Sequence, residues 1–88
     1  MKPTVKLRWT LNRFEVLFPG NRLGAFQLAF YVQLAAPEAR MELCAEHHEK
    51  GSQLFVDLHS SDDRTSIGAI LNVSLARMNL PVITFREG

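Results

Sequence analysis

The sequence lacks most of the features that would narrow its function at once. It contains a single cysteine, Cys44, so no disulfide can form within the chain. Charged residues or prolines interrupt every apolar run before it reaches the length of a membrane span. No apolar segment with a small-residue cleavage site follows Lys2 and Lys6. These absences predict a cytoplasmic protein without a membrane partner.

Motifs for metal binding and catalysis are also missing. The sequence has no C-x-x-C or H-E-x-x-H spacing, and its glycines form no phosphate-binding loop. Residue types that bind metals occur in one region of the chain, namely Glu42, Cys44, His47, His48, Asp57 and His59. Because no ligand motif relates them, and because so short a chain has little volume for an enclosed substrate pocket, we expect no metal, no cofactor and no catalytic residue. The chain is therefore predicted not to be an enzyme.

Basic and acidic residues nearly balance over the whole chain, but they are unevenly distributed along it. The net charge is +1, yet residues 1–22 carry five basic residues against one acidic residue, and the remainder carries five against eight. The basic side chains that could contact an anion or a nucleic acid are Lys6, Arg8, Arg13 and Arg22. A nucleic-acid-binding protein is thus the alternative function, although the sequence pI of about 8.0 is below the value above about 9 that is typical of such domains.

What is present is the composition of one small folded domain, residues 1–88, of which 47% are hydrophobic. Two runs of alternating apolar residues at the start predict a β-hairpin. The first run is Val5, Leu7, Trp9 and Leu11, and the second is Phe14, Val16 and Phe18. A two-residue loop at Asn12 and Arg13 would place Leu11 opposite Phe14 and Trp9 opposite Val16, with all apolar residues on one buried face.

Residues 25–35 carry two competing patterns. Apolar residues alternate over five steps, which indicates a long central strand: Phe26, Leu28, Phe30, Val32 and Leu34. As a helix, the same segment would place Leu23, Phe26, Phe30 and Leu34 on one side, and its Ala, Leu and Gln residues are good helix formers. We favour the strand because of the length of the alternation.

Residues 37–50 are also ambiguous. Pro37 and Gly51 have the positions expected at the two ends of a helix. A hairpin with residues 53–59, turning at Lys50 and Gly51, would instead set Leu43 opposite Leu58, Cys44 opposite Asp57 and Glu42 opposite His59. We favour the hairpin because the helical arrangement has a poor apolar side.

The last part of the chain has the clearest helical pattern. Residues 62–79 have apolar residues at helical spacing, preceded by Ser60 and Asp63 at the spacing of a capping box. Asn79 suits a left-handed cap and Pro81 prevents continuation. Residues 81–86 are expected to form a short final strand.

Together these elements predict an α+β fold with a mainly antiparallel sheet: a β-hairpin, a long central strand, a second hairpin, one C-terminal helix on one face and a final short strand. One helix cannot cover both faces of such a sheet. The open face would hold the residues of a partner or dimer contact, namely Arg8, Leu17, Tyr31, Glu46, Phe55 and Asp57. The sequence therefore predicts a small non-enzymatic binding or regulatory module that acts through this face or a sheet edge and forms a homodimer.

Overall fold

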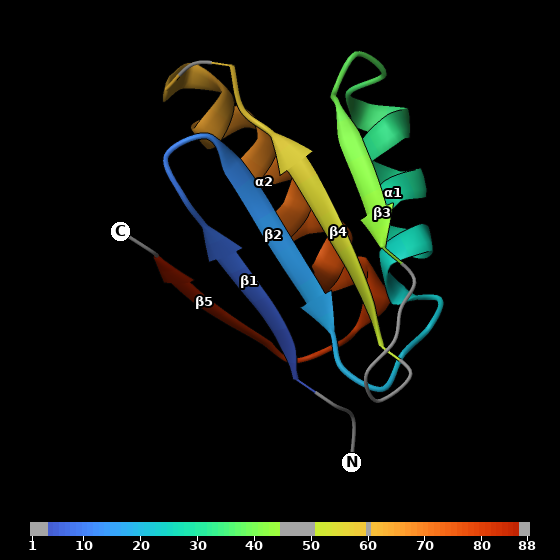
Figure 1. Ribbon diagram of the computed structural model, residues 1–88. Helices are drawn as coiled ribbons and strands as arrows, with labels where there is room; N and C mark the ends of the chain where they lie inside the picture. Colours follow the sequence, from blue (N-terminus) through green and yellow to red (C-terminus); the bar gives the residue numbers. More distant parts are fainter. Residues whose placement is uncertain (1–3, 45–50, 60, 87–88) are drawn as a thin grey trace.

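The computed structural model describes residues 4–44, 51–59 and 61–86 and has an α+β fold of two layers, a sheet and a pair of helices (Figure 1). The strands are β1 (Val5–Trp9), β2 (Arg13–Phe18), β3 (Met41–Cys44), β4 (Ser52–Asp57) and β5 (Val82–Arg86). The helices are α1 (Gly24–Ala35) and α2 (Ser61–Met78). The sheet has the order β3-β4-β2-β1-β5.

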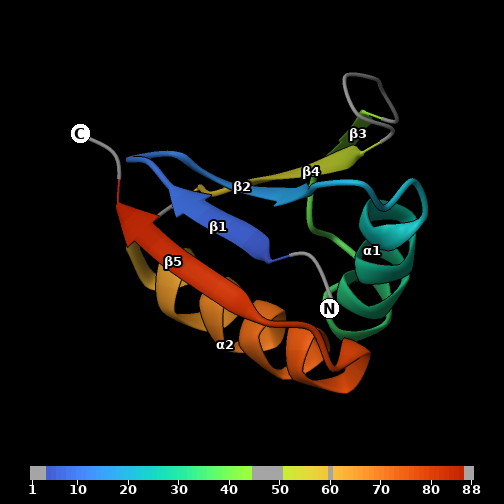
Figure 2. The same cartoon turned by 90° about the horizontal axis from the view of Figure 1, so that it is seen from below.

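The sheet is mixed, because β1 and β5 pair in parallel whereas the other three neighbouring pairs are antiparallel. Both helices join strands that run in the same direction: α1 connects β2 to β3, and α2 connects β4 to β5. The two connections start from oppositely directed strands and cross the sheet in opposite directions. Because such connections share a right-handed sense, both helices lie on one face, as Figure 2 shows. No described element covers the other face.

The predicted first hairpin is confirmed, but its register differs by two residues. Trp9 pairs with Phe14 and Leu7 pairs with Val16. The connection is longer than expected because the Thr10 N–H donates to the Arg13 carbonyl at 2.9 Å, and the Asn12 carbonyl accepts the Leu58 N–H at 2.8 Å. Since a shift of two residues keeps each side chain on its face, the predicted faces of the two strands are right and the predicted cross-strand partners are wrong. Leu11 is 87% exposed in the loop, and Trp9 is half-buried beneath two arginine guanidinium groups.

The second hairpin, β3 with β4, is also confirmed with a different register. Leu43 pairs with Leu54, Cys44 with Gln53 and Glu42 with Phe55. The prediction assumed a tight turn at Gly51. Instead Gly51 lies against β2, where an added Cβ would be 2.8 Å from the Phe18 carbonyl oxygen. The connection between β3 and β4 therefore includes residues 45–51, and Lys50, the other residue of the predicted turn, lies outside the described residues.

The prediction of a central strand at residues 25–35 is wrong, because this segment is the helix α1. Its buried residues Ala25, Leu28, Ala29 and Val32 have the spacing of one helical face, and they pack on the sheet. The apolar alternation arises because the opposite side of α1 is apolar as well. A helix therefore stands in the middle of the chain, and the fold has two helices rather than one.

The predicted C-terminal helix and final strand are confirmed as α2 and β5. Ile67, Leu71 and Leu75 are buried against the sheet. Asn79 ends the helix in the left-handed conformation, with a φ of 56°. The Asp63 carboxylate accepts the His59 N–H at 2.8 Å, as an acidic residue in a first helical turn can do; Ser60 lies outside the described residues.

The start of α1 is attached to the sheet by two close contacts. Gly24 lies directly on the buried Phe18 ring, since a Cβ at Gly24 would be 2.5 Å from Phe18 Cγ. The buried Ser52 hydroxyl of β4 accepts the Ala25 N–H at 3.1 Å and donates to the Asn21 carbonyl at 2.7 Å. These contacts satisfy buried polar groups and determine which side of α1 faces the core.

We expect Gly24→Ala to lower the free energy of unfolding by about 1–3 kcal/mol, because the new methyl group overlaps a fully buried ring. Gly68→Ala in α2 is the matched control. Its Cβ would lie 3.4 Å from Phe14 Cζ, so removal of a helical glycine should be neutral or raise stability by up to about 1 kcal/mol. Urea denaturation of both variants measures the difference. A Gly24→Ala variant as stable as the wild type would contradict this seat for α1.

Candidate protein-interaction surface

The residues predicted to form one partner face do not all lie together. Arg8, Leu17, Phe55 and Asp57 lie on the uncovered face of the sheet, on β1, β2 and β4. Tyr31 lies on α1, on the other side of the sheet, because residues 25–35 are helical. Glu46 lies outside the described residues. The predicted partner face therefore does not include Tyr31.

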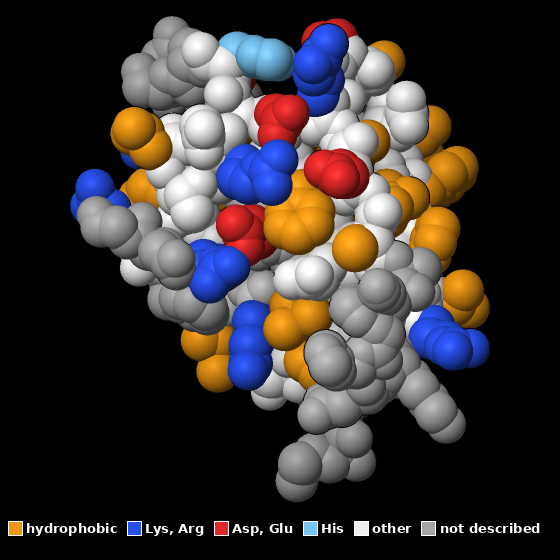
Figure 3. Space-filling view, in the orientation of Figure 1, with side chains coloured by type: hydrophobic (Ala, Val, Ile, Leu, Met, Phe, Trp, Pro, Cys, Tyr) orange, Lys and Arg blue, Asp and Glu red, His pale blue; other side chains and the backbone are white. Residues whose placement is uncertain are grey.

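The charges on the uncovered sheet face are compensated within the chain. The Arg8 guanidinium forms an ion pair with Glu15, in which Nε donates to Oε1 at 3.1 Å. Arg13 Nη2 lies 3.3 Å from Asp57 Oδ1, and the same guanidinium lies 4.9 Å from the Phe55 ring centroid. Figure 3 shows this face, with acidic and basic side chains next to one another around a few hydrophobic ones. Arg8 and Asp57, two charged residues of the predicted partner contact, thus already have partners within the chain.

The same ion pairs involve two of the four basic residues that are predicted to contact an anion or a nucleic acid. Lys6 and Arg8 lie on β1, Arg13 begins β2, and Arg22 lies in the turn before α1. Arg8 and Arg13 each face a carboxylate. These four side chains therefore do not form an uncompensated basic patch.

The register of β3 and β4 separates the residue types that could have acted together as metal ligands or as a nucleophile and base. Cys44 pairs with Gln53 rather than Asp57, and Glu42 pairs with Phe55 rather than His59. The Asp57 N–H instead donates to the Arg40 carbonyl at 2.9 Å. In the part of the chain whose side chains the structure describes, no three residues of His, Cys, Asp or Glu come together as possible metal ligands. His47 and His48 lie outside this part of the chain.

The outward side of α1 is the most unusual surface of the described chain. Four large apolar side chains follow one another along it, and we call them the α1 stripe: Leu23 at 70% exposed, Phe26 at 45%, Phe30 at 62% and Leu34 at 66%. The helix contains no charged residue. A helix on a protein surface normally has a polar outer side, whereas a helix that is apolar all round is normally covered on both sides.

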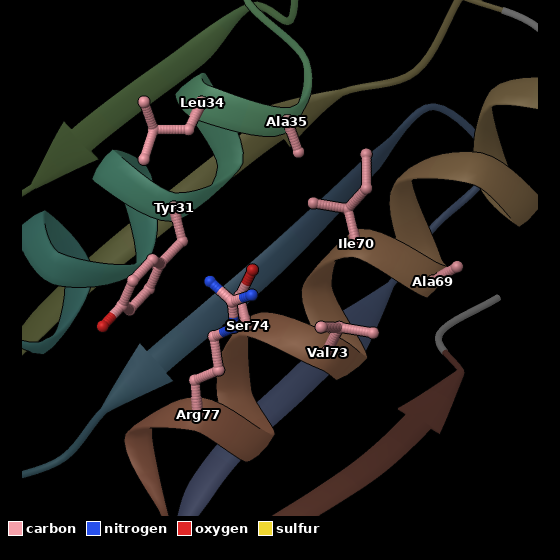
Figure 4. Close-up of a pocket in the computed structure, with 8 residues that line it drawn as sticks. All are labelled: Tyr31, Leu34, Ala35, Ala69, Ile70, Val73, Ser74 and Arg77. Atoms are coloured by element: carbon pink, nitrogen blue, oxygen red, sulfur yellow. The ribbon is translucent and has the colours of Figure 1, made fainter.

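A groove between α1 and α2 continues this apolar surface. It has a volume of about 380 Å³ and is lined by Tyr31 and Leu34 from α1 and by Ile70, Val73 and Arg77 from α2, among others (Figure 4). Val73 is 58% exposed. The Arg77 guanidinium lies 5.9 Å from the Tyr31 ring centroid and forms a basic boundary at one end.

The size of the surface distinguishes it from scattered exposed residues. If a fully exposed phenylalanine contributes about 200 Å², and leucine and valine somewhat less, the exposed fractions of the α1 stripe and Val73 correspond together to roughly 500–600 Å². This is at the upper limit of the largest apolar patch on an ordinary monomer, roughly 300–600 Å², and close to the roughly 800 Å² that each partner contributes to a standard protein interface.

Among the described helices, none is long and apolar enough to cross a membrane.

Comparison with known proteins finds no match among protein-family models, curated proteins or solved structures. The placement of the side chains therefore remains as the basis for inferring a function.

We expect the α1 stripe to be dispensable for folding of the chain. Phe30→Glu should change the free energy of unfolding by less than about 1 kcal/mol, because surface substitutions usually have small effects. Leu28→Glu, on the buried side of the same helix, should prevent folding, because it would place an unpaired charge in the core. Circular dichroism and thermal denaturation compare the two. Similar losses of stability in both variants would contradict the assignment of the outer side of α1.

Proposed function

We propose that this chain is a non-enzymatic protein-binding module whose binding surface is the α1 stripe with the adjoining groove. The observation that carries the proposal is the exposure of four large apolar side chains along a helix without charges. Covering such side chains removes apolar area from water, which is the main favourable contribution to most protein association. The aromatic residues of the stripe, Phe26 and Phe30, belong to a residue type enriched in the cores of interfaces.

The uncovered sheet face is a weaker candidate for the same role. Leu17 and Phe55 are only half-exposed there, and the neighbouring charges are paired with each other. A partner on this face would have to separate or desolvate these ion pairs, which costs free energy. The proposal therefore keeps a binding module but moves its surface from the sheet to the helical layer. A cytoplasmic location belongs to the proposal as well, and the absence of any possible internal disulfide supports it.

Affinity capture from the native host, with purified tagged protein, tests the proposal. The wild type, Phe30→Glu and Leu11→Glu are compared. Leu11 is 87% exposed and lies in the β1–β2 loop, so its replacement removes an equally exposed apolar side chain away from α1. We expect Leu11→Glu to retain the same proteins as the wild type and Phe30→Glu to lose them. Identical retention by all three would contradict the proposed surface.

A further inference from the structure

We propose that the occupant of the α1 stripe is a second copy of this chain, with the two α1 helices packed antiparallel across a two-fold axis. This inference rests on the proposed function, because it assigns a partner to the same surface. A two-fold contact requires a surface that is complementary to itself.

The order of side chains along the stripe has this property. Leucines stand at both ends and phenylalanines in the middle: Leu23, Phe26, Phe30 and Leu34. Leu23 and Leu34 lie equally far from the midpoint of the α1 stripe, which falls between Leu28 and Ala29. When two copies pack antiparallel about this midpoint, each Leu23 lies beside the Leu34 of the other copy. Each Phe26 then lies within about one helical rise, 1.5 Å, of the Phe30 of the other copy, so the four phenylalanines form the centre of the contact.

Charge favours the antiparallel arrangement over a parallel one. Arg22 precedes α1 and Glu38 follows it; both are exposed, and neither is in an ion pair with a described residue. An antiparallel contact places each Arg22 near the end of the other helix that leads to Glu38, whereas a parallel contact places the two Arg22 side chains together. α1 also has no acidic residue in its first turn and no basic residue in its last. The opposite dipole of an antiparallel neighbour supplies the compensation that its own residues do not.

The area agrees with a small dimer. If each copy covered the α1 stripe and Val73 of the other completely, roughly 600 Å² from each would bury about 1,200 Å², which is the lower end of the range for specific, stable interfaces. A membrane surface is a poorer occupant, because helices that lie on membranes carry Lys and Arg on their polar side. The residues that flank the α1 stripe within the helix are instead Gln27 and Gln33, which are uncharged.

Sedimentation equilibrium on purified protein tests the inference. We expect wild type and Leu11→Glu to be dimers at tens of micromolar, at twice the mass of 10.0 kDa. Phe30→Glu should raise the dissociation constant at least about 100-fold, because it brings two carboxylates together in an apolar contact, and like charges facing each other cost several kcal/mol. A monomeric wild type, or a Phe30→Glu dimer as stable as the wild type, would overturn the inference.

Disulfide cross-linking in a Cys44→Ser background tests the orientation. Gln27 and Gln33 flank the α1 stripe on its two sides. In the antiparallel contact, the two copies of residue 27 lie about 5 Å apart along the helix axes and those of residue 33 about 14 Å apart, at 1.5 Å per residue. Gln27→Cys should therefore cross-link much faster than Gln33→Cys, because the axial separation alone keeps the Cα atoms of residue 33 well beyond the limit of about 7 Å that a disulfide requires, whereas those of residue 27 stay near that limit. In a parallel contact each residue is level with its own copy, so equal behaviour of the two variants would contradict the antiparallel arrangement.

The outcomes separate this inference from the proposed function. A monomeric chain that still loses captured proteins on Phe30→Glu overturns the homodimer and leaves the binding surface in place. A monomeric chain whose capture does not depend on Phe30 overturns both. Binding of the wild type, but not of Phe30→Glu, to neutral phosphatidylcholine vesicles would replace the second copy with a membrane surface.

Discussion

The contact between the start of α1 and the sheet determines which side of this helix is buried and which is exposed. Gly24 has no side chain, so the backbone of α1 can lie directly on the ring of Phe18. The Ser52 hydroxyl at the same place hydrogen-bonds to both Ala25 and Asn21, so this close approach leaves no unsatisfied polar group there. Together these contacts fix the rotation of α1 about its axis. The small and aliphatic side, with Ala25 and Leu28, then enters the core, and the phenylalanines of the α1 stripe face outward.

The topology explains why the molecule has two surfaces of different character. Both helical connections fall on one face of the sheet, so the opposite face of the strands meets solvent (Figure 2). That face alternates acidic and basic side chains across neighbouring strands, and pairs such as Arg8 with Glu15 hold them in place. Such partly exposed pairs contribute little to stability, but they suit a surface that stays in contact with water. The apolar area that is not needed for the core is concentrated on the helical layer instead.

The sequence correctly predicts those elements that depend on local features, namely the period of the apolar residues and the residues that end a helix. The alternation in β1 and β2, the apolar spacing in α2 and the stop at Asn79 and Pro81 depend on period and capping, and they appear in the structure. The registers could not be predicted, because they depend on contacts from elsewhere, such as the close approach of Gly51 to Phe18. Residues 25–35 were misassigned because an apolar helix with two apolar sides also satisfies the alternation of a strand. Because of that error, the sequence did not predict the α1 stripe as an exposed surface. Its four residues do form a helical pattern in the sequence, but only the fold shows that the other side of the helix is the buried one.

The α1 stripe faces outward in one copy, and we propose that a second copy covers it. Hydroxyl-radical footprinting of Phe30 over a range of protein concentrations examines both statements, with buried Phe18 and half-exposed Phe55 as internal references. At high dilution, Phe30 should be modified far more than Phe18. As the concentration rises, modification of Phe30 should fall, whereas that of Phe55 on the uncovered sheet face should not change. Modification of Phe30 as low as that of Phe18 at every dilution, or unaffected by concentration, would contradict the account.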